Sequence, residues 1–475
     1  MQNRKSEVAG MNAFTRTQVN SSRNALIVFT REPEPGKTKT RLMPYLSPEQ
    51  CAELHRCMLK DISREMRKAD AALIVAYTGE NTGDPVFLRS IMGKSALFIR
   101  QRGGDIGSRM QNAIEDVLGL GYDKAVLIGT DIPEIKAETI NASLDLLESC
   151  DVVMGPTYDG GYYLIGMKAL HPEAFNVESY GGSTVFDETA GSLRKAGLSV
   201  RETDAYADLD TKDDLSGFRR RMRKDPRLRK SRTGRFLAQT AKISVIVPVY
   251  NEAAEIGRLI GQLKPYRNDC EIIIVDGEST DGTPEKICEY AGEASRDILI
   301  LKEKKSRSLQ MNAGAGKATG DILFFLHCDS VLPDDFPDEI LHVMSANDWG
   351  CFRIRFTSSN FFMLTNCIVS NYRALCRKLP FGDQGIFIDR DMFFEAGMFP
   401  EIPLMEDYEF SMRMKHRKGV KGPGLTGKWL VTSARRYGRG TGSILRTEIQ
   451  MWNLRRMYRK GVSSGILRNI YKDIR

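Results

Sequence analysis

The sequence predicts an α/β protein made of two tandem domains, each with three layers in which helices cover both faces of a mostly parallel sheet. Short apolar runs that end abruptly in Pro, Gly, Asp, Asn or Ser recur along the chain, as is typical of buried parallel strands that open into binding loops. Stretches with helical periodicity alternate with these runs. The length of 475 residues is too great for one ordinary core and suits two.

The expected elements follow the same layout in both halves. Strands of the first half are predicted at 25–29, 71–76, 125–131 and 151–155. Those of the second half are predicted at 244–249, 272–275, 298–301 and 322–326, with helices near 253–263, 283–294 and 307–318.

A basic run between Arg219 and Lys242 cannot be buried and predicts the boundary between the two domains. The predicted parts are a disordered tail at 1–22, a first domain at 23–218, a basic linker at 219–242, a second domain at 243–440 and a basic amphipathic tail at 441–475. Because no aromatic residues interleave with the basic run, a solvated or helical linker is favoured over a nucleic-acid surface. Nucleic acid is therefore not an expected partner.

Charge is unevenly distributed along a chain whose formal net charge is +8. Residues 415–475 contain 16 Lys or Arg and only two acidic residues, Glu448 and Asp473. No apolar run approaches the ~20 residues needed to cross a bilayer, and the first 22 residues lack the apolar core of a signal peptide. Nine cysteines without a C-x-x-C motif indicate reduced thiols and argue against zinc, so a cytoplasmic protein is expected.

Acidic residues follow strands in both halves, at Gly129-Thr-Asp131 and at His327-Cys-Asp329. Ligands of open α/β sheets bind at the carboxyl ends of the strands, and Mg²⁺ or Mn²⁺ is commonly held there by one or two carboxylates together with substrate phosphates. A divalent cation, Mn²⁺ or Mg²⁺, is therefore the expected cofactor.

The second half carries a characteristic series of motifs. They are Pro248, Tyr250, Asn251 and Glu252, then Asp276 with Ser279-Thr-Asp-Gly-Thr283, then Asp329, and finally Glu406-Asp407. In this order they resemble family 2 glycosyltransferases of the GT-A fold. Arg307-Ser-Leu-Gln-Met-Asn-Ala-Gly-Ala315 and Gly382-Asp-Gln-Gly385 extend the resemblance to the subgroup called rSAM/selenodomain-associated transferase 2.

The resemblance implies a metal-dependent, inverting glycosyltransferase with a nucleotide-sugar donor. Asp407 would be the general base beside Glu406, and Asp329 would ligate the cation. The remaining implied contacts to the nucleotide-sugar are Pro248, Tyr250, Glu252, Asp276, Gln310, Asn312, His327, Arg435 and Arg436, while Asp383 and Gln384 would border the acceptor. His327 occupies the first acidic position of the family's D-x-D pattern, so the site is altered there; a neutral imidazole still bonds a hydroxyl or a metal.

Motifs of the first half are Pro33-Glu-Pro-Gly-Lys-Thr-Lys-Thr-Arg-Leu42, Gln101 with Gly104-Asp-Ile-Gly107, Gly129-Thr-Asp-Ile-Pro133, Asp159-Gly-Gly161 and Asp208-Leu-Asp-Thr211. They resemble rSAM/selenodomain-associated transferase 1, a relative of GT-A nucleotidyltransferases. A Walker A loop is excluded because Arg31 stands where its first glycine is required. The resemblance implies a nucleotide site with Lys37, Lys39, Arg41, Asp105, Arg109 and Asp159, and a cation on Asp131 and Asp210.

The C-terminal tail places Ile449, Trp452 and Met457 among basic residues. Two interpretations remain: an interfacial helix on an anionic membrane, suited to a lipid-linked acceptor, or apolar residues that pack on the domain while the charges stay in water. Phe361-Phe-Met-Leu364 belongs either to the same surface or to the acceptor pocket. Two other functions stay open for the whole chain, namely donor synthesis by the first half for use by the second, and a docking scaffold with one silent domain.

Overall fold

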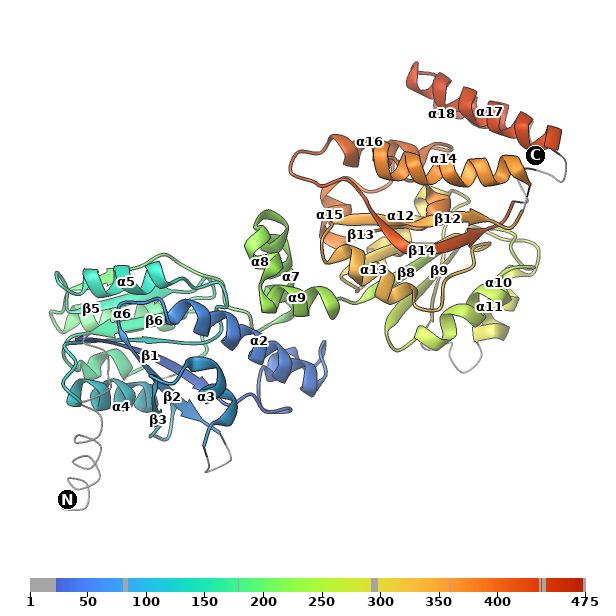
Figure 1. Cartoon of the computed structure of the whole chain (residues 1–475). Coiled ribbons are helices and arrows are strands. Elements are labelled where there is room, and N and C mark those ends of the chain that lie inside the picture. Colours follow the sequence, from blue (N-terminus) through green and yellow to red (C-terminus); the bar gives the residue numbers. More distant parts are fainter. Residues whose placement is uncertain are drawn as a thin grey trace. The chain divides into compact units, whose positions relative to one another are not determined.

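The computed structural model describes residues 23–79, 84–177, 179–291, 298–358, 360–434, 437 and 441–472. The predicted N-terminal tail at 1–22 lies outside these ranges. The chain divides into two compact units, Met1–Leu237 and Ala238–Arg475, which are blue to green and yellow-green to red in Figure 1.

The first unit is built on a seven-stranded sheet in the order β3-β2-β1-β4-β6-β5-β7. Its strands are β1 (Asn24–Arg31), β2 (Ala72–Thr78), β3 (Leu97–Arg100), β4 (Lys124–Ile128), β5 (Val152–Pro156), β6 (Tyr162–Met167) and β7 (Val200–Glu202). The helices are α2 (Pro48–Met66), α3 (Val86–Met92), α4 (Ile106–Gly119), α5 (Ala137–Leu146), α6 (Val185–Lys195), α7 (Lys212–Lys224), α8 (Pro226–Lys230) and α9 (Arg232–Gln239).

The second unit has the same order in its sheet, β10-β9-β8-β11-β13-β12-β14. Its strands are β8 (Ile243–Val249), β9 (Cys270–Asp276), β10 (Ile298–Lys302), β11 (Ile322–Phe325), β12 (Trp349–Phe356), β13 (Ile386–Asp389) and β14 (Gly424–Thr432). The helices are α10 (Ile256–Leu263), α11 (Thr283–Ala291), α12 (Arg307–Lys317), α13 (Phe336–Met344), α14 (Phe361–Arg377), α15 (Arg390–Glu395), α16 (Glu406–His416), α17 (Thr441–Arg459) and α18 (Ser464–Lys472).

Strand directions also agree between the sheets. In each sheet the strand that comes sixth along the chain, β6 or β13, takes the fifth place in the sheet and is antiparallel to both of its neighbours. The other neighbouring pairs are parallel. The eight strands predicted from the sequence are all present. Six were missed, three in each half: β3, β6 and β7, and β12, β13 and β14.

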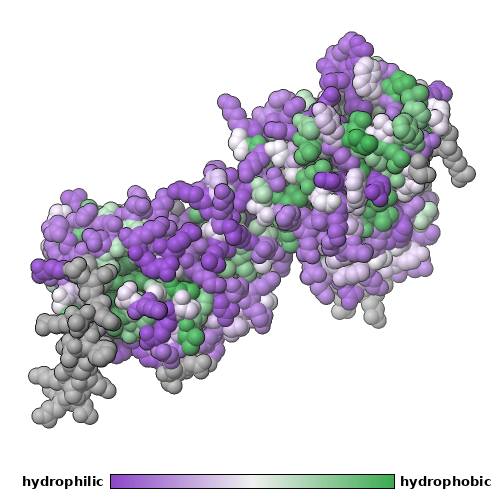
Figure 2. All heavy atoms as spheres, viewed as in Figure 1, coloured by the Kyte–Doolittle hydropathy of each residue, from purple (hydrophilic) through white to green (hydrophobic). Residues whose placement is uncertain are grey.

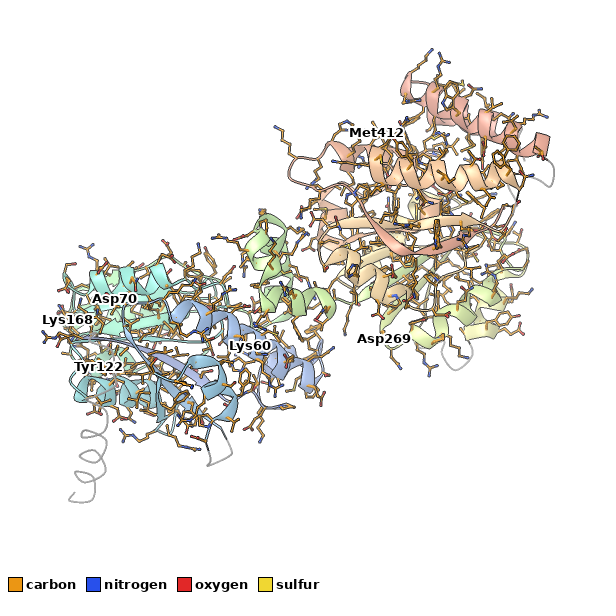
Figure 3. The ribbon with its side chains drawn as sticks, in the orientation of Figure 1. Lys60, Asp70, Tyr122, Lys168, Asp269 and Met412 are labelled. Carbon is orange, nitrogen blue, oxygen red and sulfur yellow. The ribbon has the colours of Figure 1, made fainter. Side chains whose placement is uncertain are left out.

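Each sheet separates two apolar cores, which makes each unit three layers thick. Leu26 and Val28 of β1 pack into one core, whereas Ala25 and Ile27 pack into the other. Alternate residues of a strand point to opposite faces, so a strand with helices on both sides is apolar throughout. Figure 3 shows side chains filling the space between each sheet and its helices. The predicted class, two α/β domains of the GT-A type, is confirmed.

The basic stretch at 219–242 is largely helical. Phe218 and Met222 of α7 and Leu237 of α9 pack in one core with Leu42 and Leu54, while the charged side chains lie outside that core. Among the described helices none is long and apolar enough to cross a membrane.

Candidate functional site

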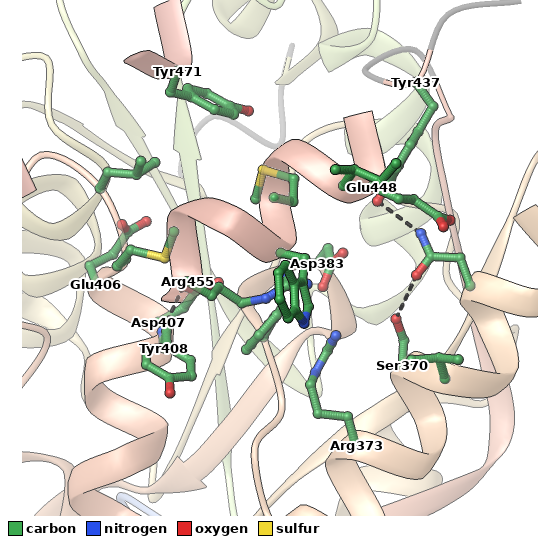
Figure 4. Close-up of a pocket in the computed structure, with 18 of the residues that line it drawn as sticks. Ser370, Arg373, Asp383, Glu406, Asp407, Tyr408, Tyr437, Glu448, Arg455 and Tyr471 are labelled. Atoms are coloured by element: carbon green, nitrogen blue, oxygen red, sulfur yellow. Dashed lines mark hydrogen bonds between the residues drawn. The ribbon is translucent and has the colours of Figure 1, made fainter. Parts of the chain in front are cut away.

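A pocket of about 390 Å³ lies at the end of β11 in the C-terminal half. His327, two residues beyond β11, and Asp383 line it together with Glu406 and Asp407 at the start of α16. Helices α14 and α17 form the remaining walls (Figure 4). Four residues predicted from the sequence therefore converge on one cavity.

Asp407 is fixed by backbone donors. Its Oδ2 accepts the N–H of Gly382 at 2.8 Å, and its Oδ1 accepts the N–H of Tyr408 at 2.7 Å. A Cβ built on Gly382 would lie 3.1 Å from His327 Nε2 and 3.3 Å from Asp407 Oδ2, so the imidazole and the carboxylate flank this glycine. Within the described part of the chain the hydrogen bonds to both Asp407 oxygens come from the backbone, and the remaining lone pairs can accept a proton.

Glu406, unlike its neighbour Asp407, is buried and forms an ion pair with Arg307. Its Oε1 accepts a hydrogen bond from Arg307 Nη1 at 3.2 Å. Burial raises the pKa of the Glu406 carboxyl, the charge of Arg307 opposes that rise, and Asp407 adds to it. The ion pair positions the first turn of α16 and so supports its neighbour Asp407.

Two arginines that sequence reasoning missed line the same pocket. Arg373 of α14 lies 3.5 Å from the centre of the Phe381 ring, and Arg455 of α17 lies 5.6 Å from it. Burial lowers the pKa of Arg373 to about 10 and also lowers that of Arg455. Both stay cationic at neutral pH and give the pocket a positive wall beside Asp383 (Figure 4). Guanidinium groups in such a place suit phosphate oxygens.

The ends of β8 and β9 form the side of the site expected to hold the nucleoside. Asn251, with φ of 51°, accepts the N–H of Thr280 and donates its own N–H to Ser279. These bonds join the two loops. Asp276 is buried at the end of β9, where Oδ2 accepts the N–H of Ser279 and Oδ1 has no protein partner among the described residues. A buried carboxylate oxygen without a partner is costly, and a ligand hydroxyl or N–H would satisfy it.

Gln310 and Asn312, which the sequence assigns to the nucleotide-sugar, form hydrogen bonds with backbone atoms of the protein. The Gln310 amide donates to Val249 O at 2.7 Å and Val275 O at 2.8 Å, so it joins the ends of β8 and β9. Asn312 bonds the backbone of Phe399 through both its amide N and its O.

Further predicted residues lie around these. Gln384 is buried and accepts from Arg373. Pro248 lies within β8, and the ammonium of Lys305 lies 3.6 Å from the centre of the Tyr250 ring. Arg435 and Arg436 fall outside the described residues.

Two carboxylates near the end of β11 fit a divalent cation. Asp329 follows β11 and Glu252 follows the neighbouring parallel strand β8, so both lie beyond the carboxyl ends of adjacent strands. Burial raises the pKa of the Cys328 thiol, and the charges of Glu252 and Asp329 raise it further. Within the described ranges no group of three His, Cys, Asp or Glu is arranged to hold a metal. One or two carboxylates with substrate phosphates are the usual Mg²⁺ environment, so the residues present fit a cation that arrives with a diphosphate.

The N-terminal half has a second pocket, of about 530 Å³, at the corresponding end of its sheet. Predicted residues that line it are Lys37, Lys39, Arg41, Asp131, Asp159 and Asp210. Gln101 also lines it, and its amide donates to Thr30 O at 2.8 Å and Ala76 O at 2.9 Å. It joins the ends of β1 and β2 just as Gln310 joins those of β8 and β9.

Lys39 lies between the two aspartates that the sequence assigns to a cation. Its Nζ is 2.6 Å from Asp131 Oδ1 and 3.7 Å from Asp210 Oδ1, and it also donates to Leu209 O at 2.6 Å. The Lys39 side chain is only 4% exposed. Arg41 bonds the other oxygen of Asp210 at 3.1 Å. The structure therefore brings Asp131 and Asp210 together around an ammonium group.

Asp105 and Arg109, also assigned to this site, do not line the pocket. Asp105 caps α4 by accepting the N–H of Ser108 at 2.8 Å, and hydrogen bonds from Ser108 lower its pKa. Arg109 donates to Gly103 O. Asp159 opens the turn between β5 and β6 and accepts from Thr157 and Gly161.

Two more titratable groups line this pocket. Burial, followed by the charge of Lys39, lowers the pKa of His55 to about 3, so the imidazole is neutral at pH 7. Burial, followed by the charge of Asp159, raises the pKa of Asp208 to about 6.

The two sheets, with acidic residues beyond their strand ends, define the class of protein as a tandem of α/β domains of the GT-A type. Comparison with known families then identifies each half. Residues 62–182 match "Uncharacterized protein conserved in bacteria (DUF2064)", and residues 244–402 match "Glycosyl transferase family 2". The chain is thus a DUF2064 domain fused to a family 2 glycosyltransferase domain, and both family resemblances drawn from the sequence are confirmed.

Individual relatives agree with this assignment. A 2-phospho-L-lactate guanylyltransferase of Methanothermobacter thermautotrophicus is 28% identical over 37% of this chain and 76% of its own. An undecaprenyl-phosphate 4-deoxy-4-formamido-L-arabinose transferase of Proteus mirabilis is 29% identical over 23% of this chain and 34% of its own.

Among solved structures, a protein of Desulfovibrio desulfuricans provisionally described as a nucleotide-diphospho-sugar transferase is 32% identical over 46% of this chain and 94% of its own, with a TM-score of 0.43. The chain spans between 31% and 61% of the length of these and other curated glycosyltransferases that it matches.

Proposed function

We propose that the C-terminal half transfers a sugar from a nucleotide-sugar to a hydroxyl of an acceptor, with inversion and with Asp407 as general base. The observation that carries this proposal is the position of Asp407, five residues beyond the segment 244–402 that matches family 2 glycosyltransferases, in one pocket with His327 and Asp383 of that segment. The backbone bonds from Gly382 and Tyr408 hold the carboxylate toward the cavity.

The proposed mechanism follows from these positions. The nucleoside lies along the ends of β8 and β9 and bonds the free oxygen of Asp276. Glu252 and Asp329 would hold a divalent cation, which would supply positive charge to offset that of the departing diphosphate. Asp407 removes the acceptor proton as the acceptor oxygen attacks the anomeric carbon from the face opposite the diphosphate, and a single displacement of this kind inverts that carbon.

The test is to replace Asp407 by Asn, which keeps the shape and removes the base. Transfer or hydrolysis of UDP- and GDP-sugars should fall by roughly 10² to 10⁴ because that is what a positioned general base contributes. Glu409→Gln, on the same helix but outside the pocket, is the matched control and should keep its activity. Equal activity in the Asp407→Asn variant and the control would refute the role of Asp407.

A second activity is proposed for the N-terminal half, nucleotidyl transfer to a phosphorylated substrate. It is favoured by the basic loop of Lys37, Lys39 and Arg41 in the second pocket and by the relationship to a guanylyltransferase. The test uses the full chain carrying Asp407→Asn, which silences the proposed glycosyl transfer. Pyrophosphate release from GTP or UTP with a sugar phosphate, lost on Arg41→Met, would support donor synthesis; release unaffected by Arg41→Met would contradict the assigned site.

A further inference from the structure

Helix α14 exposes an apolar stripe where a surface helix normally carries polar residues. The exposed side chains recur at helical spacing: Phe361 (73% exposed), Leu364, Ile368 (69%), Val369, Tyr372 and Leu375. Its opposite side packs into the domain through Met363 and Cys367. A helix that is apolar on both sides is normally covered on both, so this surface indicates a binding partner.

The stripe continues on α17, which lies against α14. Ile444 and Leu454 of α17 are buried in the domain, whereas Leu445, Ile449 and Trp452 are exposed. Asn360 at the start of α14 bonds Thr441 at the start of α17 at 3.1 Å. In Figure 2 hydrophobic residues gather over this part of the molecule. We call the exposed apolar residues of the two helices the apolar face.

The apolar face surrounds the mouth of the pocket that contains Asp407. Val369, Leu445, Ile449 and Trp452 are exposed, and the same four side chains line that pocket. Whatever covers the apolar face therefore also meets the pocket opening.

The exposed charged side chains of α17 and α18 are basic, whereas the carboxylates near the apolar face, Asp383, Glu406, Asp407 and Glu448, line the pocket. Residues 361–378 contain no Asp or Glu, and in α17 and α18 the fully exposed charged residues within the described part of the chain are Arg446, Arg456, Arg459 and Arg468. Glu448 is partly buried, and burial raises the pKa of its carboxyl. Arg456 lies 5.5 Å from the centre of the Trp452 ring. Apolar side chains with Trp, bordered by arginines, match the acyl and anionic head-group regions of a bilayer surface.

A second copy of the chain fits this face less well. In a twofold interface each copy presents the same patch, so arginines would face arginines and repel. We infer that the apolar face docks on an anionic lipid bilayer and holds the mouth of the pocket at the membrane surface, where an acceptor embedded in the lipid could enter. The entry of a lipid-embedded acceptor rests on the proposed function, whereas docking of the apolar face on the bilayer does not.

The test is flotation of the full chain with phosphatidylcholine vesicles that do or do not contain phosphatidylglycerol. The chain should float with the anionic vesicles and sediment without phosphatidylglycerol, and added salt should weaken binding. Phe361→Ser with Ile368→Ser should lower the partition coefficient at least ~10-fold, since two large apolar side chains no longer enter the interface. Arg456→Glu with Arg459→Glu should lower it by roughly fivefold or more for each residue.

The matched control is Val86→Ser with Leu299→Ser, two exposed apolar residues that do not belong to α14 or α17. Circular dichroism checks that all variants fold. Flotation itself is measured without any transferase assay. No flotation of the wild type, or equal flotation of the Phe361→Ser/Ile368→Ser variant, would overturn the inference. Concentration-dependent dimers that this variant abolishes, without vesicle binding, would instead assign the face to a second copy.

Discussion

Replacing Lys39 by Met tests whether an ammonium group holds the N-terminal site together. Methionine keeps most of the length and the apolar body of lysine and removes its charge and donors. The variant loses the contacts to Asp131 Oδ1 and Leu209 O, both at 2.6 Å, and leaves Asp131 and Asp210 facing each other.

The magnitude follows from burial. Removing one partner of a fully buried ion pair costs about 3–5 kcal/mol. Lys39 is 4% exposed but the Asp131 side chain is 55% exposed, so water compensates part of the loss and about 2–3 kcal/mol is expected.

The pH dependence has a definite sign. Without Lys39 the proximity of two carboxylates raises the pKa of one of them in the folded protein above its unfolded value of ~3.9. The folded state then binds the extra proton, so the loss of stability is greatest at neutral pH and shrinks as the pH falls toward ~4.

The assay exploits the distribution of tryptophan. All three Trp residues, Trp349, Trp429 and Trp452, lie in the C-terminal half, so their fluorescence follows that half, whereas far-ultraviolet circular dichroism follows both. In urea, Lys39→Met should lower the midpoint of the transition seen by circular dichroism but not by fluorescence. Adding Asp131→Asn should recover part of the loss, because it removes the excess charge. An unchanged midpoint, or no recovery in the double variant, would refute the reasoning.

Further predictions concern the same half and use the same circular dichroism signal. Gly160 has a φ of 90°, and an added Cβ would lie 1.9 Å from Ser183 O, so Gly160→Ala should destabilise by more than ~1 kcal/mol, whereas the control Gly191→Ala, in open space on α6, should be neutral or stabilising. Burial lowers the pKa of His55 in the folded protein to about 3, so the unfolded state binds the proton first as the pH falls below the unfolded pKa of ~6.5. The free energy of unfolding should therefore decrease by about 1.4 kcal/mol per pH unit below that value. His55→Gln should remove this decrease between about pH 6.5 and 4.5. The pKa of Asp208 is raised to about 6, so its ionised form opposes folding; Asp208→Asn should raise the thermal midpoint above about pH 7, and the gain should vanish near pH 4, whereas a gain that grows in acid would contradict the assignment.

The sequence predicted the first strands of each sheet because they are apolar at every position. β8 and β9 are nearly fully buried, and such runs are easily recognised. The later strands carry mixed patterns: β12 exposes Arg353 and Arg355, and β14 includes Gly427 and Lys428. The missed strands also include β6 and β13, which are short and buried inside their sheets, whereas the exposed edge strand β10 was predicted because its residues are apolar.

The residues of the candidate site likewise divide into those that a local sequence pattern predicted and those that it did not. Asp329 and Asp407 follow short motifs that can be read locally, whereas Arg373 and Arg455 reach the pocket from helices that carry no such motif. Pairing of Lys39 with Asp131 joins residues 92 positions apart. Nothing in either local sequence announces that contact, because only the packing of β1 against β4 brings them together.

The amide groups of Gln101 and Gln310 have a shared consequence for both halves. Each joins carbonyls within the last three residues of two neighbouring parallel strands, close to where the chain leaves the sheet for the pocket. The separation of those strand ends is then set before any ligand arrives. A nucleotide that binds would then have only the loops to order, so the conformational entropy lost on binding would come from the loops and not from the sheet.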